Sequence, residues 1–339
     1  FIKFTSSNVC FMFKEETLMN KFLPAVIGTG LLIAGAANAA DFPAPTVYGR
    51  AHVSVGMIDD DAGSATEVSS RSSRFGMKGK YELDAGLTAT YKFEFQVDVT
   101  DEAESKENHI KARNQYAGIK GSFGEIRVGR HDTAYKSATS KLDPWGDTYA
   151  DYNSIIEKDF DKRADNTIIY VNKFDALGLQ ASYSAGTDTT AGDNDGSIFA
   201  LGATYKASGL LIGGGYESID ETGSAFKIGA SYNFDAFTLG GVVESVDYDE
   251  GVNEDQTNII LTGAFKVSDK GTIKATYGQK DIDDLDDDPT MFAIGYNHKF
   301  NKKASAYLLA ATSQDEGLAD KGGLDGDGTV FALGLKYNF

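Results

Sequence analysis

The chain is poor in cysteine, proline and tryptophan, and it has no long apolar run beyond its N-terminal region. Of 339 residues, one is cysteine, five are proline and one is tryptophan. The single cysteine, Cys10, cannot form a disulfide within the chain. After Ala40 no run of 18 apolar residues occurs, which excludes a helical membrane protein. The 38 glycines, 17 tyrosines and 21 phenylalanines are instead typical of β structure.

Positive charge is also scarce relative to negative charge. The chain has 32 Lys and Arg against 50 Asp and Glu, a net charge of −18. A general nucleic-acid binder would be basic, so that class is excluded. The histidines show neither metal-ligand nor triad spacing, and the acidic stretch 281–289 lacks the spacing of an EF-hand loop. We therefore expect no metal, no cofactor and no catalytic residues.

The N-terminal region has the pattern of an export signal. A short basic start at residues 19–21 precedes the apolar stretch 22–37, and Ala37-Asn38-Ala39 matches a signal-peptidase cleavage site. We predict a signal peptide over residues 19–39 and a mature domain over residues 40–339. Residues 1–18 precede Met19 and are expected to be a non-native upstream segment.

Residues that alternate between apolar and polar recur along the rest of the chain. In residues 87–99 every second side chain is apolar, and polar side chains lie between them. This period of two predicts strands with one apolar and one polar face. The predicted strands are 47–57, 74–81, 87–99, 114–120, 125–130, 167–172, 177–183, 199–205, 210–217, 226–234, 237–244, 259–267, 272–280, 292–300, 304–312 and 331–339.

The connections between these strands alternate in length. Short connections such as 84–86, 175–176 and 235–236 alternate with longer, mostly acidic ones. The long connections are 59–72, 100–112, 131–165, 185–196, 219–223, 249–256, 281–289 and 314–327. Outer-membrane barrels have short periplasmic turns and long external loops. The pattern predicts an all-β fold, a 16-stranded antiparallel transmembrane β-barrel. Its polar face, which includes Lys80, Lys92, Glu94 and Lys227, is too polar for a packed core and would line water.

Several motifs resemble those of the trimeric general porins of Gram-negative outer membranes. They are "VYGR" at 47–50, "SSRFGMKGKYEL" at 72–83, "KARNQYAGIKGSFGEIRVGRHDTAY" at 111–135 and the terminal Phe339. The resemblance implies an outer-membrane channel for passive diffusion of ions and small hydrophilic solutes, with a third loop folded inward. In place of the family's frequent Pro-Glu-Phe-Gly-Gly, this loop reads "LDPWGDTYADY" at 142–152. The course of the loop is therefore not predicted.

The resemblance also implies a charged pore constriction, with cations on the wall and acids on the third loop. Arg50 and Arg74 match family motifs and lie on predicted polar faces, while Lys78 shares the inward face. The remaining candidates are Arg113 and Arg163 on the wall, which depend on the resemblance, and Asp143, Asp147 and Asp151 on the loop. The acidic loops indicate a mild preference for cations. The alternative for each basic side chain is simple solvation or contact with lipopolysaccharide.

The implied partners are two further copies of the chain, outer-membrane lipid and lipopolysaccharide, and the barrel-assembly machinery. Small outward residues on the first strand, beginning with Gly49, would allow close approach of a neighbouring barrel. We expect Glu104 of the second loop to pair with Arg130 of a neighbour. Tyr337 and Phe339 resemble the family's assembly signal.

Three alternatives remain from the sequence. A sugar- or anion-selective channel would need a specialised lumen, and Tyr48 is a single aromatic residue on the polar face of its strand. A barrel enzyme would need a Ser-His or Asp-His constellation, which the sequence does not show. A secreted β-rich adhesin would not need an apolar band or a terminal aromatic residue.

Overall fold

The computed structural model describes residues 43–100, 110–186, 196–315 and 327–339. The predicted signal peptide and Glu104 lie outside these ranges. The chain divides into two units, Phe1–Pro43 and Ala44–Phe339, and all described strands and helices belong to the second. Within the described ranges, no helix has the length and apolar character needed to cross a membrane.

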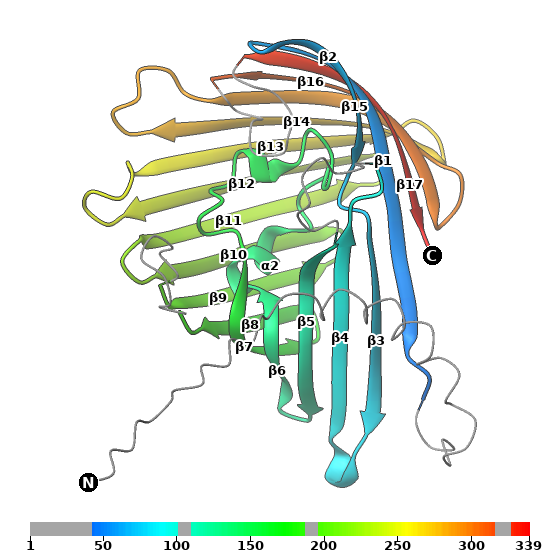
Figure 1. Ribbon diagram of the computed structural model, residues 1–339, viewed down its shortest axis with the longest axis vertical. Coiled ribbons are helices and arrows are strands. Elements are labelled where there is room, and N and C mark those ends of the chain that lie inside the picture. Colours follow the sequence, from blue (N-terminus) through cyan, green and yellow to red (C-terminus); the bar gives the residue numbers. More distant parts are fainter. Residues whose placement is uncertain (1–42, 101–109, 187–195, 316–326) are drawn as a thin grey trace, which may run out of the picture. The chain divides into compact units, whose positions relative to one another are not determined.

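The second unit is one antiparallel sheet that closes on itself, because β1 pairs with β17 as well as with β2 and β3 (Figure 1). The strands are β1 (Thr46–Asp60), β2 (Gly63–Ser70), β3 (Arg74–Glu82), β4 (Thr88–Val97), β5 (Ile110–Gly121), β6 (Gly124–Asp132), β7 (Arg163–Phe174), β8 (Leu177–Ser184), β9 (Ile198–Ala207), β10 (Leu210–Ile219), β11 (Gly223–Phe234), β12 (Phe237–Tyr248), β13 (Gln256–Lys266), β14 (Gly271–Ile282), β15 (Thr290–Lys299), β16 (Ala304–Gln314) and β17 (Gly328–Asn338). Closure pairs the backbone groups around the whole ring, as a lipid environment requires.

The sheet has 17 strands, but β2 and β3 are two parts of one barrel strand. Both pair with β1, through Val53↔Ser70 and Arg50↔Arg74, and residues 71–73 interrupt them. The barrel is therefore 16-stranded, as the sequence predicts. The prediction that 59–72 is a long loop is wrong, because β2 occupies most of this range. β2 forms a tight hairpin with β1, in which Asp60 pairs with Gly63.

The outer face of the barrel is apolar and exposed, as alternation predicts. On β17, Phe331, Leu333 and Leu335 are each more than 50% exposed, while Val330 and Ala332, which alternate with them, are buried. Similar exposed apolar side chains occur on strands all around the sheet. Water-soluble monomers rarely expose so continuous an apolar surface, whereas outer-membrane barrels place such a band against lipid.

The two ends of the barrel wall meet at the terminal residue. The Phe339 amide donates to the Gly49 carbonyl oxygen at 3.0 Å, and the Gly49 amide donates to the Phe339 oxygen at 3.2 Å. The Phe339 ring occupies the place where a Cβ of Gly49 would be, 2.3 Å from its nearest atom. Tyr337 and Phe339 are both exposed on the outer face. The predicted smooth strip on β1 is thus covered at Gly49 by the chain's own last side chain.

Candidate pore constriction

The connection between β6 and β7, residues 133–162 (hereafter the inner loop), lies against the inner face of the barrel. It contains the short helix α2 (Ala134–Thr139), which contacts β8 to β11 (Figure 1). The Thr133 hydroxyl accepts a hydrogen bond from the Lys136 amide at 3.2 Å and so caps this helix. The side chains that the loop contacts alternate with the lipid-facing ones on the same strands.

Glycines in the wall make room for the inner loop. A Cβ at Gly202 would lie 2.3 Å from the Ala134 oxygen, and one at Gly213 would lie 2.1 Å from the Ala138 oxygen. At other wall glycines, an added side chain would collide with side chains of the inner loop. These glycines are Gly56, Gly229, Gly278 and Gly295. Backbone therefore packs directly on backbone along β9 and β10, which explains the glycine-rich sequence there.

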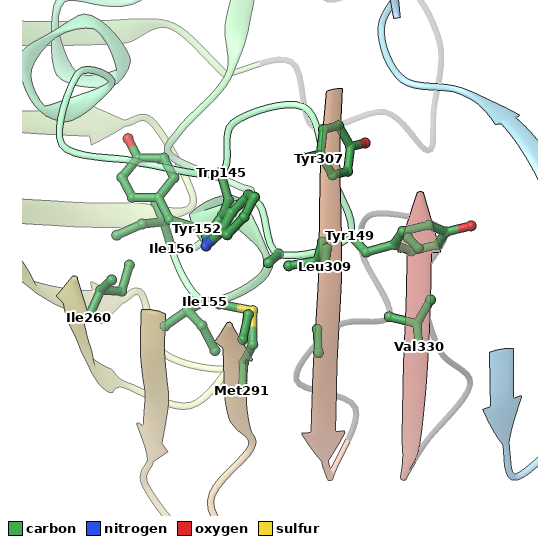
Figure 2. Packing of buried hydrophobic residues seen from close by; sticks show 14 of the residues in the cluster. Trp145, Tyr149, Tyr152, Ile155, Ile156, Ile260, Met291, Tyr307, Leu309 and Val330 are labelled. Carbon is green, nitrogen blue, oxygen red and sulfur yellow. The ribbon is translucent and has the colours of Figure 1, made fainter. Parts of the chain in front are cut away.

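Apolar side chains of the inner loop form a packed core with one side of the wall. Figure 2 shows Trp145, Tyr149, Tyr152, Ile155 and Ile156 beside wall residues from β13, β15, β16 and β17. These wall residues are Ile260, Met291, Tyr307, Leu309 and Val330. The expectation that the whole inner face is too polar for a packed core is wrong. The sequence pattern does not reveal that the inner loop covers this part of the wall.

A buried ionic network fastens the other half of the inner loop. Asp161 forms ion pairs with Lys136 and with Lys227, whose side chain is fully buried rather than lining water as predicted. Burial opposes ionisation of Asp161, but the two ammonium groups outweigh it and lower its pKa to about 2. Nearby, Glu244 accepts hydrogen bonds from the Tyr135 hydroxyl at 2.5 Å and from the Glu157 amide at 2.7 Å.

At the tip of the inner loop, one carboxylate is held by two wall arginines. Asp147 Oδ2 lies 2.6 Å from Arg50 Nη1 and 2.5 Å from Arg74 Nη2. Arg50 and Arg74 are direct cross-strand partners, and two like charges in this position repel each other. The shared carboxylate offsets that repulsion. Burial opposes ionisation of Asp147, yet Arg74 and Arg50 together hold its pKa below its usual range.

The other two predicted arginines lie on the same wall but pair with wall acids. Arg113 Nε lies 3.0 Å from Glu94 Oε1, and Arg163 Nη2 lies 2.7 Å from Asp132 Oδ1. Neither has an ion pair with the inner loop among the described residues. The structure therefore brings Arg50, Arg74 and Asp147 together and places Arg113 and Arg163 farther along the charged wall.

Asp143 and Asp151 differ from Asp147, because they shape the loop. Asp143 accepts hydrogen bonds from the Trp145 amide at 2.8 Å and the Tyr152 amide at 3.4 Å. Asp151 accepts the Asp147 amide at 2.7 Å. Burial, reinforced by the negative charge of Asp151, raises the pKa of Asp143 well above its usual range. Asp147 itself has φ of 63°, a left-handed conformation that turns its carboxylate toward the wall arginines.

Lys78, Glu94 and Arg71 complete the charged wall, and the sequence predicts neither Glu94 nor Arg71 as a constriction residue. Lys78 Nζ lies 5.2 Å from the centre of the Tyr48 ring, and the Tyr48 hydroxyl donates to Glu94 at 2.8 Å. Glu94 is on the predicted polar face, but the sequence does not show that it binds Arg113. The Arg71 guanidinium stacks on the Tyr149 ring, 3.4 Å from the ring centre. The sequence did not predict this position, because residues 59–72 were expected to form a loop.

The predicted contact between protomers is not described by the structure. Arg130 Nη1 forms an ion pair within the chain, 2.6 Å from Asp165 Oδ2. Its predicted partner Glu104 lies outside the described residues, and the pairing stays a prediction. Within the described ranges, no group of three His, Cys, Asp or Glu residues could hold a metal ion.

Curated relatives share part of the sequence. Outer membrane protein U of Vibrio vulnificus is 29% identical over 222 residues, which are 60% of this chain and 62% of that protein. Major outer membrane protein P.IB of Neisseria meningitidis serogroup B is 25% identical over 286 residues, 79% of this chain and 83% of that protein. The chain thus spans less than two thirds of the length of the first of these relatives.

The fold and the family model extend the match to most of the chain. An anion-selective porin from Comamonas acidovorans superposes with a TM-score of 0.74 at 22% identity, covering 87% of this chain and 99% of that one. At this identity the superposition establishes the fold. The family model described as Gram-negative porin matches residues 25–318. The chain therefore belongs to the Gram-negative porin family, a family of outer-membrane β-barrels.

Proposed function

We propose that this chain forms a water-filled channel in the outer membrane through which ions and small hydrophilic solutes diffuse passively. The observation that carries the proposal is the Arg50–Asp147–Arg74 cluster, in which the inner loop meets the opposite wall. These three side chains are only 15–24% exposed. A constriction with fixed charges of both signs favours polar solutes, which can align with its field, over apolar ones.

The charge balance around the constriction favours anions. Among the ion-paired side chains there, the four cations Arg50, Arg74, Lys92 and Arg113 share two acids, Asp147 and Glu94. This excess of positive charge is formed by side chains of the wall and the tip of the inner loop, whereas the described acidic loops 249–255 and 283–289 lie at the loop end of the barrel. Nearby charges dominate because water and salt screen distant ones. We therefore expect a mild preference for anions, in place of the cation preference that the acidic loops indicate.

Conductance of the purified protein in a planar lipid bilayer tests the proposal. We expect stepwise increases in current. Under a KCl gradient, the reversal potential should have the sign expected when chloride is more permeant than potassium. Absence of conductance steps from a correctly folded, heat-modifiable protein would refute the channel. A reversal potential of the opposite sign would refute the charge balance but not the channel.

A homotrimer in contact with lipid, lipopolysaccharide and the assembly machinery belongs to the same proposal. The exposed apolar outer face supports the lipid contact. Conductance steps in groups of three, with a matching mass by light scattering in detergent, would support the trimer. Replacing Arg130 should lower the temperature at which the folded oligomer dissociates if the predicted contact with Glu104 forms.

The residues support a channel over an enzyme. His52, fully buried, bonds the Tyr307 hydroxyl at 3.1 Å, and His131 Nδ1 donates to the backbone carbonyl oxygen of Asp132 at 2.7 Å. These contacts give neither imidazole the serine or aspartate partner of a hydrolytic site. A screen with a lipid ester and a peptide substrate tests this point directly.

A further inference from the structure

A basic cavity lies at the short-turn end of the barrel interior. It has a volume of about 670 Å³ and is lined by the β13–β14 and β15–β16 turns together with side chains of β14, β15 and β17. Six lysines line it, with one acid, Asp269. The lysines are Lys270, Lys274, Lys299, Lys302, Lys303 and Lys336. We call this cavity the lysine vestibule.

The lysine vestibule has few acidic neighbours: Asp269 lines it, and Asp143 and Asp147 of the inner loop act on Lys274 and Lys336. Within the described part of the chain, none of its six lysines forms an ion pair. Lys274 donates to the Pro144 oxygen at 2.6 Å, which joins the vestibule to the inner loop. The wall arginines differ, because Arg50, Arg74 and Arg113 each have a carboxylate partner. The vestibule therefore has a formal charge of about +5 that an external anion can satisfy.

The opposite end of the same strands carries the opposite charge. The loops that join β12 to β13 and β14 to β15 enclose a cleft lined by six acids and no cation. The acids are Asp249, Glu250, Glu254, Asp255, Asp283 and Asp284. Because successive strands are antiparallel, these loops and the vestibule turns lie at opposite ends of the barrel. A multivalent anion is repelled at the acidic end and attracted at the basic end.

We infer that the lysine vestibule binds small multivalent oxyanions that carry several phosphate-type groups. Ammonium groups on flexible stems suit this ligand class, because each can reach a different oxygen of a compact polyanion. A monovalent ion gains from only part of the cluster, whereas a ligand with several charges contacts several lysines at once. This inference rests on the proposed channel function, since binding at the cavity is read as block of the channel current.

Block of single-channel current by inorganic tripolyphosphate tests the inference. The variant K299Q/K302Q/K303Q removes three vestibule charges, and K120Q/K173Q/K206Q is its matched control. The control removes three lysines near other short turns that do not line the cavity. We expect tripolyphosphate to block the wild-type channel more strongly from the side that faces the short turns, where the lysine vestibule lies. The vestibule variant should raise the half-blocking concentration about tenfold and the control less than about twofold.

The outcomes separate this inference from the proposed function. A channel that conducts but is insensitive to tripolyphosphate would overturn the vestibule and leave the channel intact. Equal shifts in the two triple variants would also overturn it, since the effect would then be one of general charge. Absence of any conductance would refute the channel, and equilibrium dialysis of tripolyphosphate against wild type and the vestibule variant would still decide binding.

Discussion

Replacing Asp147 by asparagine isolates the charge of the inner loop from its shape. Asp147 has φ of 63°, a conformation that asparagine also adopts readily, so the backbone turn should persist. The variant removes the carboxylate that Arg50 and Arg74 share. Its amide keeps an acceptor oxygen for one guanidinium. The expected change is therefore electrostatic.

The magnitude follows from the local charge. The variant changes the formal charge of the three-residue cluster from +1 to +2. One unit charge about 6 Å away in water alters the energy of a monovalent ion by about 0.7 kcal/mol, which screening at about 0.1 M salt reduces to about 0.4 kcal/mol. Anions gain this energy and cations lose it. The anion-to-cation permeability ratio should rise about fourfold, since about 1.4 kcal/mol corresponds to a factor of ten.

The assay is the reversal potential of D147N in a planar bilayer under a low-salt KCl gradient. The matched control is D175N, which changes an exposed aspartate that also has positive φ, 49°, in the turn between β7 and β8. The control should leave the reversal potential near that of wild type. If D147N and D175N gave the same value, or if D147N shifted toward cations, the assignment of Asp147 to the constriction would be wrong.

Three further variants test other parts of the structure. D143N should leave selectivity near wild type, unlike D147N, because burial already disfavours the Asp143 charge and its role is to accept loop amides; reversal potential decides. G213A should displace the inner loop and destabilise the barrel by about 1–3 kcal/mol, whereas G214A on the outward face should cost less; unfolding in urea compares them. K227M should lower the free energy of unfolding by about 3 kcal/mol, because it leaves buried carboxylates with one cation fewer; the same urea titration measures it.

The strands were predictable because lipid and water on opposite faces enforce a period of two. The terminal strand shows this, since every second residue from Phe331 is exposed and apolar. β2 (Gly63–Ser70) escaped prediction because its sequence, "GSATEVSS", has small and polar residues on both faces. Its first six residues are exposed whichever way they point, so alternation is not enforced there. The turn before it also lacks the Gly-rich length of the other external loops.

The direction of the two wall arginines in the candidate constriction was predictable, but which of the three loop aspartates meets them was not. Arg50 and Arg74 lie on polar faces of clear strands, so their direction follows from register. Asp143, Asp147 and Asp151 have the same side chain within nine residues, and only the loop backbone distinguishes them. That backbone depends on hydrogen bonds that Asp143 and Asp151 themselves accept. A single sequence contains no period that reveals such bonds.

The inner face of the barrel has two parts, one that packs the inner loop and one that carries charges. The alternating sequence pattern is the same in both. From β9 to β17, small and apolar inward residues and one buried ionic network hold the inner loop, so this side acts as a protein core except at the lysine vestibule. On β1 and on β3 to β7, the inward face instead carries charged side chains that are only partly exposed. Because the loop is packed on one side, it places a low-dielectric body next to the remaining passage. Charges such as Arg74 and Asp147 therefore act on ions through less water than in an open barrel, and their effect on selectivity is stronger.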